Sequence, residues 1–232
     1  MKKNNLQNIK LLFLLMILTP YANATWSIIA VDRETGGIGI AGASCTFDVQ
    51  GIGSIVPGKG AIVVQAASSY YAQMKGVDLM EQNTPIEDIL KAMASKEFKP
   101  EQQQYGVVVL TSGTTPLVQS GESIADWNGS KIDEDFAVLG NILVSEEVIN
   151  NAYSKFNSIR DQPLSVRLMS SLKAGEESGG DKRCGPQYAR SAFISIYDPK
   201  SGAIVKLSVY GIEKGGRPAV TILESQFEKL NK

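Results

Sequence analysis

The stretch TWSIIAVDRETGGIGIAGAS, residues 25–44, decides how we interpret the fold. Residues 26–32 and 38–44 are each dominated by apolar, β-branched or small side chains, which is typical of strands. The intervening segment 33–37 ends in two glycines and has the composition of a turn. The stretch therefore predicts a β-hairpin whose first strand begins beside Thr25.

The residues before this hairpin, 1–24, have the pattern of a cleavable secretory signal peptide. Their start is basic, residues 11–18 are an unbroken apolar run, and the tripeptide ANA at 22–24 is a small-x-small cleavage site. The alternative is a membrane anchor, but a spanning helix needs roughly 20 apolar residues. We therefore expect a periplasmic or secreted protein, without membrane association after cleavage, whose mature domain is residues 25–232.

Composition excludes several classes of function. Without the three basic residues of the leader, the mature chain holds 20 basic and 24 acidic residues, a net charge of −4 that argues against nucleic-acid binding. The chain contains no histidine, which excludes Ser-His-Asp and Cys-His catalysis and a His-ligated zinc. An α-amino group, with a reference pKa of about 7.7–8, is then the natural general base near neutral pH. We expect no cofactor and no metal.

The two cysteines, Cys45 and Cys184, predict a disulfide, because paired cysteines of an exported protein are usually oxidised. A reactive thiol is the alternative. In the chain-entropy model, closing so long a loop stabilises the fold by roughly 5 kcal/mol as an upper estimate. The bond would tie the polar, Gly-rich loop 176–184 to the end of the second strand.

Beyond the hairpin, the pattern predicts two blocks of strands and two pairs of helices within one domain. Thr84-Pro85-Ile86-Glu87 predicts a helix start with a capping box, and Asn128-Gly129 predicts a hairpin turn. The expected strands are 51–56, 61–67, 105–111, 116–120, 135–139, 191–197, 203–210 and 219–223, and the expected helices cover 69–82 and follow Thr84, Ser145 and Pro163. Strands that arrive as hairpins favour antiparallel sheets, so periodicity predicts a mixed α/β or α+β class.

A chain that begins with threonine and enters such a hairpin resembles the N-terminal nucleophile (Ntn) hydrolases, which include the proteasome β-subunits. That resemblance implies a four-layer αββα sandwich, with two mainly antiparallel sheets between helix pairs. The chain is more closely similar to the bacterial and archaeal family called domain of unknown function 1028. The matching segments are 25–32 (TWSIIAVD), 39–45 (GIAGASC), 53–57 (GSIVP), 65–66 (QA), 140–143 (GNIL) and 179–183 (GGDKR). Some relatives in that family carry a peptidoglycan-binding domain, which suggests cell-wall chemistry.

The resemblance points to Thr25 as a nucleophile whose own α-amine takes the hydroxyl proton. Asn141 is a candidate oxyanion donor, or alternatively a cap of a turn at a strand end. Asp181, Lys182 and Arg183 form a candidate ionic group that could lower the pKa of the amine or bind a substrate carboxylate; the alternative is a solvated loop. Ser44 and Gln65 are candidate substrate-binding residues.

Two further polar segments are interpreted as turns. Lys59 resembles in rough position a lysine of proteasome-like sites, but its Pro57-Gly58 and Gly60 neighbours favour a turn. The acidic run 133–135 suggests a hard-cation site, and an acidic turn before a strand is the preferred interpretation.

Three functions follow as hypotheses. The first is an exported amidohydrolase of a small-molecule or peptide amide, such as a wall fragment. The second is a non-catalytic ligand-binding module on the same fold, and the third is a structural envelope protein. The sequence is compatible with a homo-oligomer and does not identify the substrate.

Overall fold

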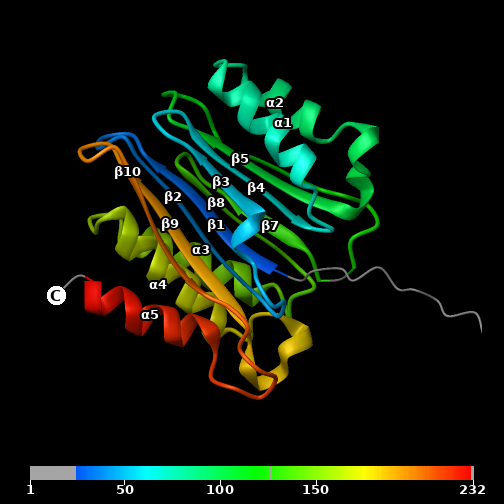
Figure 1. Cartoon of the computed structure of the whole chain (residues 1–232), viewed down its shortest axis with the longest axis vertical. Coiled ribbons are helices and arrows are strands. Elements are labelled where there is room, and N and C mark those ends of the chain that lie inside the picture. The colour runs from blue at the N-terminus through cyan, green and yellow to red at the C-terminus, as the bar shows by residue number, and fades with distance from the viewer. Residues whose placement is uncertain (1–24, 126, 231–232) are drawn as a thin grey trace, which may run out of the picture.

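A computed structural model describes residues 25–125 and 127–230, which form two stacked β-sheets with helices on both outer faces (Figure 1). The predicted signal peptide, residues 1–24, lies outside these described residues. Within them, no helix combines the length and the apolar character that crossing a membrane requires.

The larger sheet contains six strands within the described residues, in the order β10-β9-β2-β1-β8-β7, and all neighbours are antiparallel. The predicted hairpin is confirmed and forms its centre, with Val31 opposite Ile38 near the turn. The strands are β1 (Thr25–Asp32), β2 (Gly37–Ser44), β7 (Gly129–Ile132), β8 (Phe136–Asn141), β9 (Ser191–Asp198) and β10 (Ala203–Val209).

The smaller sheet has four described strands in the order β3-β4-β5-β6, again all antiparallel. They are β3 (Gly53–Val56), β4 (Gly60–Ala66), β5 (Gln103–Val109) and β6 (Leu117–Ser120). Strand β4 lies against β1 of the larger sheet, so the two sheets meet face to face at the hairpin.

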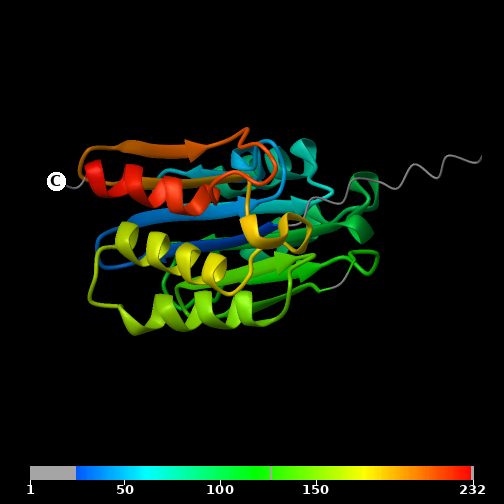
Figure 2. The ribbon, with the colours of Figure 1, turned by 90° about the horizontal axis from the view of Figure 1, so that it is seen from below.

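Helices complete four layers, as the resemblance implied. Helices α1 (Tyr70–Glu81) and α2 (Ile86–Met93) cover the smaller sheet, and α3 (Glu147–Ser158), α4 (Leu164–Glu177) and α5 (Ala219–Leu230) lie side by side on the larger one (Figure 2). Short 3₁₀ segments cover Gln50–Ile52, Lys96–Phe98, Pro100–Gln102 and Lys182–Gln187. The αββα arrangement of an α+β protein is therefore confirmed.

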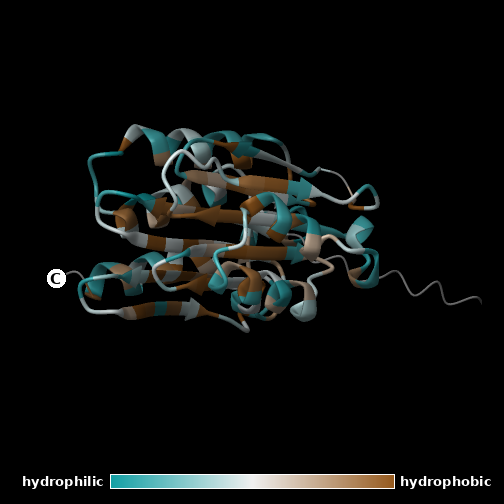
Figure 3. Ribbon diagram, turned by 90° about the horizontal axis from the view of Figure 1, so that it is seen from above, coloured by the Kyte–Doolittle hydropathy of each residue, from teal (hydrophilic) through white to brown (hydrophobic). Residues whose placement is uncertain are grey.

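Three apolar clusters fill the spaces between the layers, and the strands of both sheets are coloured largely as hydrophobic (Figure 3). Strand β1 serves two of them, because alternate side chains point to opposite faces. Trp26 and Ile28 pack toward the helices, whereas Ile29 and Val31 pack between the sheets. By the same alternation, the Thr25 side chain points between the sheets.

Glycine in β2 allows helix α4 to approach the larger sheet closely. A methyl group added at Gly39 would lie 2.2 Å from Leu168 Cδ1, so the Leu168 side chain could not keep its present position against the sheet. The glycines of this strand therefore serve packing as well as the strand itself.

One predicted strand is wrong. Residues 219–223 form the start of α5, whose buried Ala219, Val220 and Leu223 pack in the cluster that α4 and β9 share. Their β-branched composition suggested a strand, but Phe227 continues the apolar face at helical spacing. The larger sheet thus carries three described helices where a pair was expected.

Two local predictions are also corrected. Thr84 does not cap α2, because Pro85 holds the N-cap position and no side-chain capping bond forms there. Asn128-Gly129 is not a hairpin turn, since β7 begins at Gly129 and the chain reverses at residues 133–135. Strand β7 is a short, mostly exposed edge strand without an apolar pattern, which is why it was missed.

Candidate functional site

Thr25 lies between two of the residues that were selected with it. It pairs with Ser44, the last residue of β2, and with Asn141, the last residue of β8. Directly opposed residues of antiparallel strands present their side chains on one face, here the face toward the smaller sheet. All three are buried, with exposed fractions of 1%, 0% and 0%. The ends of two strands and the start of a third thus bring three polar side chains together inside the sandwich.

Gln65 of β4 reaches this point from the smaller sheet. Its Oε1 accepts a hydrogen bond of 2.7 Å from Ser27 Oγ, and its Nε2 donates to the Thr25 carbonyl oxygen at 3.4 Å. The same Nε2 donates to Gln104 Oε1 at 2.7 Å. Gln65 is completely buried, so these contacts replace the water that the amide has lost.

Gln104 of β5 belongs to the same network and was missed by sequence reasoning. Its Nε2 donates to Ser120 Oγ at 2.9 Å and to the Gly140 carbonyl at 3.1 Å, and its Oε1 accepts from Asn141 Nδ2 at 3.3 Å. Gln103 and Gln104, at the start of the otherwise largely apolar strand β5, were the sequence feature that could have indicated it. We call the four buried side chains Ser27, Gln65, Gln104 and Asn141 the amide network.

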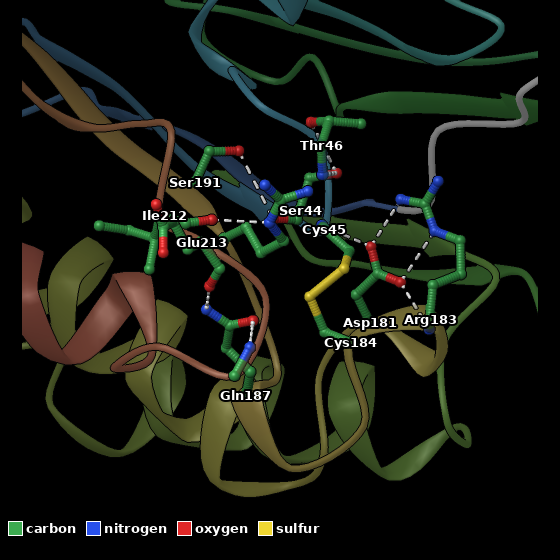
Figure 4. Close-up of a disulfide and its surroundings, with 12 residues drawn as sticks. Ser44, Cys45, Thr46, Asp181, Arg183, Cys184, Gln187, Ser191, Ile212 and Glu213 are labelled. Atoms are coloured by element: carbon green, nitrogen blue, oxygen red, sulfur yellow. Dashed lines mark hydrogen bonds and ion pairs between the residues drawn. A yellow bond between two sulfur atoms is a disulfide. The ribbon is translucent and has the colours of Figure 1, made fainter.

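The predicted disulfide is confirmed. Cys45 and Cys184 are bonded across a separation of 139 residues, and the bond anchors the Lys182–Gln187 segment beside the end of β2 (Figure 4). Because Cys45 directly follows Ser44, the bridge places this segment one residue from the Thr25 pairing. The reactive-thiol alternative does not apply to the bonded pair.

Asp181 is the buried member of the ionic group, with an exposed fraction of 0%. Its Oδ2 accepts the Cys45 N–H at 2.6 Å and pairs with Arg183 Nη2 at 2.8 Å, and its Oδ1 accepts the Arg183 N–H at 2.9 Å (Figure 4). A backbone bond from Lys182 N–H to the Ile142 carbonyl joins this loop to the end of β8. The side chain of Lys182 is exposed, so only Asp181 is built into the buried site.

A model of the family described as being of unknown function, DUF1028, matches residues 25–215. The chain belongs to this family. The match begins at Thr25, where β1 also begins. A DUF1028 protein from Silicibacter pomeroyi, known from a crystal structure, is similar with a TM-score of 0.76 and 23% identity over 90% of both chains. At that identity the similarity shows the fold alone. A comparison with curated proteins found no match.

Exposed aromatic side chains stand at the same end of the DUF1028 domain. Phe47 follows β2, Tyr70 and Tyr71 follow β4, and Tyr210 follows β10; each is at least 61% exposed. The Phe47 and Tyr210 rings lie 6.2 Å apart. A hollow of about 410 Å³ beside them is lined by Asp48, Gln50, Gly51, Gly53, Ser54, Tyr70, Gln73, Met74 and Lys206. The exposed aromatic residues and the hollow together offer both apolar and hydrogen-bonding surface to a ligand.

Lys59 lies at the opposite end of the domain, as the turn interpretation implied. It precedes β4, whereas Gln65 is near the end of that strand, and its Nζ donates to Asn83 Oδ1. A larger cavity of about 540 Å³ is found there, lined in part by Thr84 and Thr111. The structure does not bring Lys59 to Thr25.

The acidic run at 133–135 is a hydrogen-bonded turn. Burial acts to raise the pKa of Asp133, but hydrogen bonds outweigh it and lower that pKa to about 2. The donors are Glu134 N–H, Tyr153 Oη, Asn157 Nδ2 and Arg160 Nη2. Among the described residues, no group of three or more His, Cys, Asp or Glu side chains could hold a metal ion.

Proposed function

We propose that this DUF1028 protein is an exported amidohydrolase in which cleavage after Ala24 makes Thr25 the N-terminal nucleophile. Its substrate would be a small amide or peptide, such as a cell-wall fragment. The observation that carries the proposal is the gathering of buried polar side chains around Thr25. Burying hydroxyls and amides is unfavourable unless they are paired, so a fold that does so at a strand end is positioning them.

The chemistry uses groups of one residue. The Thr25 hydroxyl oxygen attacks the substrate carbonyl carbon while its proton passes to the Thr25 α-amine, directly or through one water. The carbon–nitrogen bond then breaks, the leaving amine takes the proton, and an ester remains on Thr25. Water hydrolyses that ester and restores the hydroxyl. A chain without histidine has no imidazole for this role.

The wider fold supports a place among the N-terminal nucleophile hydrolases. Thr25 starts a central strand of the larger sheet, and its side chain points toward the smaller sheet of a four-layer sandwich. That is the arrangement which the resemblance implies. We extend the proposal to this superfamily on that basis.

The ionic group Asp181, Lys182 and Arg183 would adjust the pKa of the Thr25 amine. A cation near it disfavours the ammonium form and so lowers its pKa. Arg183 is tied to the buried Asp181 carboxylate at 2.8 Å, which fixes its position and partly offsets its charge. The exposed Lys182 is the better candidate for meeting an anionic substrate group.

The experiment is covalent labelling of purified protein whose N-terminal residue is Thr25. A threonine-directed acylating probe should modify Thr25, found by peptide mapping, and Thr25→Ala should remove both adduct and hydrolysis. Thr35→Ala, in the turn of the same hairpin, is the matched control and should label like the unaltered chain.

Other outcomes identify the other hypotheses. Ligand binding that survives in Thr25→Ala, without any adduct, would overturn catalysis in favour of a binding module. Absence of both ligand and adduct would indicate a structural envelope protein.

A further inference from the structure

The end of strand β8 contains a buried hydrogen-bond acceptor that is left over. Asn141 has an exposed fraction of 0%, and its Oδ1 makes no hydrogen bond within the described part of the chain. Its Nδ2 donates one of its two hydrogens to Gln104 Oε1 at 3.3 Å. A buried polar atom without a partner is uncommon in folded proteins and calls for a reason.

The amide network fixes which atom of Asn141 is left over. Gln104 Nε2 faces the carbonyl oxygens of Gly129 and Gly140, at 3.2 and 3.1 Å, and carbonyl oxygens can only accept. Its Oε1 must therefore face the other way, toward Gln65 and Asn141. Both of these must offer their NH₂ groups to it, which leaves the Asn141 oxygen outside the network.

The register shows which residue faces Asn141 across the ladder. Val31 N–H donates to the Asp135 carbonyl at 2.9 Å, so odd-numbered residues of β1 direct their backbone groups toward β8. This direction repeats at every second residue of the strand, so the backbone nitrogen of Thr25 also points toward β8, where the paired residue is Asn141. The left-over acceptor and the nitrogen belong to the same residue pair.

We propose that Asn141 is a positioning residue that holds the α-amine of processed Thr25 through its Oδ1. Cleavage after Ala24 changes the Thr25 nitrogen from an amide with one N–H into an amine with two, or an ammonium with three. The new donor matches the acceptor that has no partner among residues 25–125 and 127–230 before cleavage. The inference rests on the proposed processing at Thr25. It assigns Asn141 Oδ1 to the amine, in place of the oxyanion-donor role expected of this residue, while Nδ2 keeps its bond to Gln104 Oε1.

The titration of the amine provides a readout that a merely structural role would not move. An acceptor favours the charged form of an amine, so its loss should lower the amine pKa, and a carboxylate in its place should raise it. We expect Asn141→Leu to lower the pKa of the Thr25 amine by about one unit and Asn141→Asp to raise it by at least as much.

The measurement uses the full chain cut after Ala24, labelled with ¹⁵N-threonine and titrated by NMR. Asn157→Leu is the matched control, because Asn157 also lies on α3 but donates to Asp133 Oδ2, at the opposite end of the domain from Thr25. The control should leave the amine pKa unchanged. If the Leu variant does not fold, the isosteric Asp variant decides alone: a raised pKa supports the role, and an unchanged or lowered pKa overturns it.

This test and that of the hydrolase proposal fail in different ways. The amine titrates whether or not Thr25 is ever acylated, so an absent acyl adduct would leave the pKa comparison readable. An amine pKa that stays constant in both Asn141 variants, while acylation of Thr25 slows, would assign Asn141 to the oxyanion and overturn the positioning role.

Discussion

The two ends of the sandwich handle polar groups in different ways. At the Thr25 end, side chains of Ser27, Gln65, Gln104 and Asn141 are buried and bonded to one another, and a disulfide ties the adjacent loop. At the opposite end, Arg33 pairs with Asp135 and Lys59 with Asn83 around the 540 Å³ cavity, with solvent access.

Cavity volume and the gathering of buried polar side chains therefore point to different ends of this molecule. The larger cavity is lined by groups that water can also satisfy, so their arrangement is weakly specified. Buried amides have no such substitute, and each must be held by a partner. The arrangement of polar side chains is therefore more strictly specified at the buried Thr25 end than at the opposite end. Four perturbations can test this contrast.

Loss of the disulfide should have the largest effect. Replacing Cys45 and Cys184 together by serine removes a constraint across 139 residues, for which we expect a loss of about 4 kcal/mol in the free energy of unfolding. Urea denaturation of oxidised wild-type and double-variant protein measures it. A loss below about 1 kcal/mol would show that the Thr25 end is held by its packing alone.

Breaking the amide network should come next. Gln65→Leu removes the acceptor of Ser27 Oγ and one of the two donors to Gln104 Oε1 in a fully buried position, and we expect a loss of about 2 kcal/mol in the free energy of unfolding. The same denaturation experiment applies. An unchanged free energy of unfolding would mean that water satisfies the polar groups at the Thr25 end, as it can at the opposite end.

Acid should weaken the opposite end selectively. Because the folded-state pKa of Asp133 is lowered to about 2, its contribution is present above its ordinary pKa and is lost as pH falls from about 4 to 2. We expect this contribution to the free energy of unfolding to be about 1 kcal/mol, because the Asp133 carboxylate is partly exposed. Asp133→Asn should abolish this part of the pH dependence. Stability measured from pH 5 to 2 checks it; an unchanged profile in the variant would contradict the assignment.

Lys59→Ala should have the smallest effect. Its bond to Asn83 is exposed, so we expect a change below about 0.5 kcal/mol and unchanged labelling of Thr25. Labelling lost in this variant, with the fold intact, would place Lys59 in the mechanism and reverse the contrast between the ends.

Sequence reasoning succeeded where a pattern was local. The hairpin of residues 25–44 combined apolar strands with a glycine turn, and the structure has both strands within a residue of their expected bounds. It failed for α5, because three β-branched residues, Val220 to Ile222, also suit a strand, and only packing on α4 and β9 selects the helix.

The candidate site divides in the same way. Thr25, Ser44, Asn141 and Gln65 were selected through the family resemblance, and the structure brings them together. Gln104 was missed, because its role depends on the register of β5 against β4 and on carbonyls of β7 and β8. The network also determines which atom of Asn141 is left without a partner among the described residues, and no local pattern encodes it.

The central claim is that one residue supplies both the attacking oxygen and the base, and intact-mass analysis of protein recovered after export tests it most directly. The account predicts a chain that starts at Thr25 with an unmodified α-amine, and a mass two hydrogens below that of the reduced form. A different first residue, or an acylated terminal nitrogen, would contradict it.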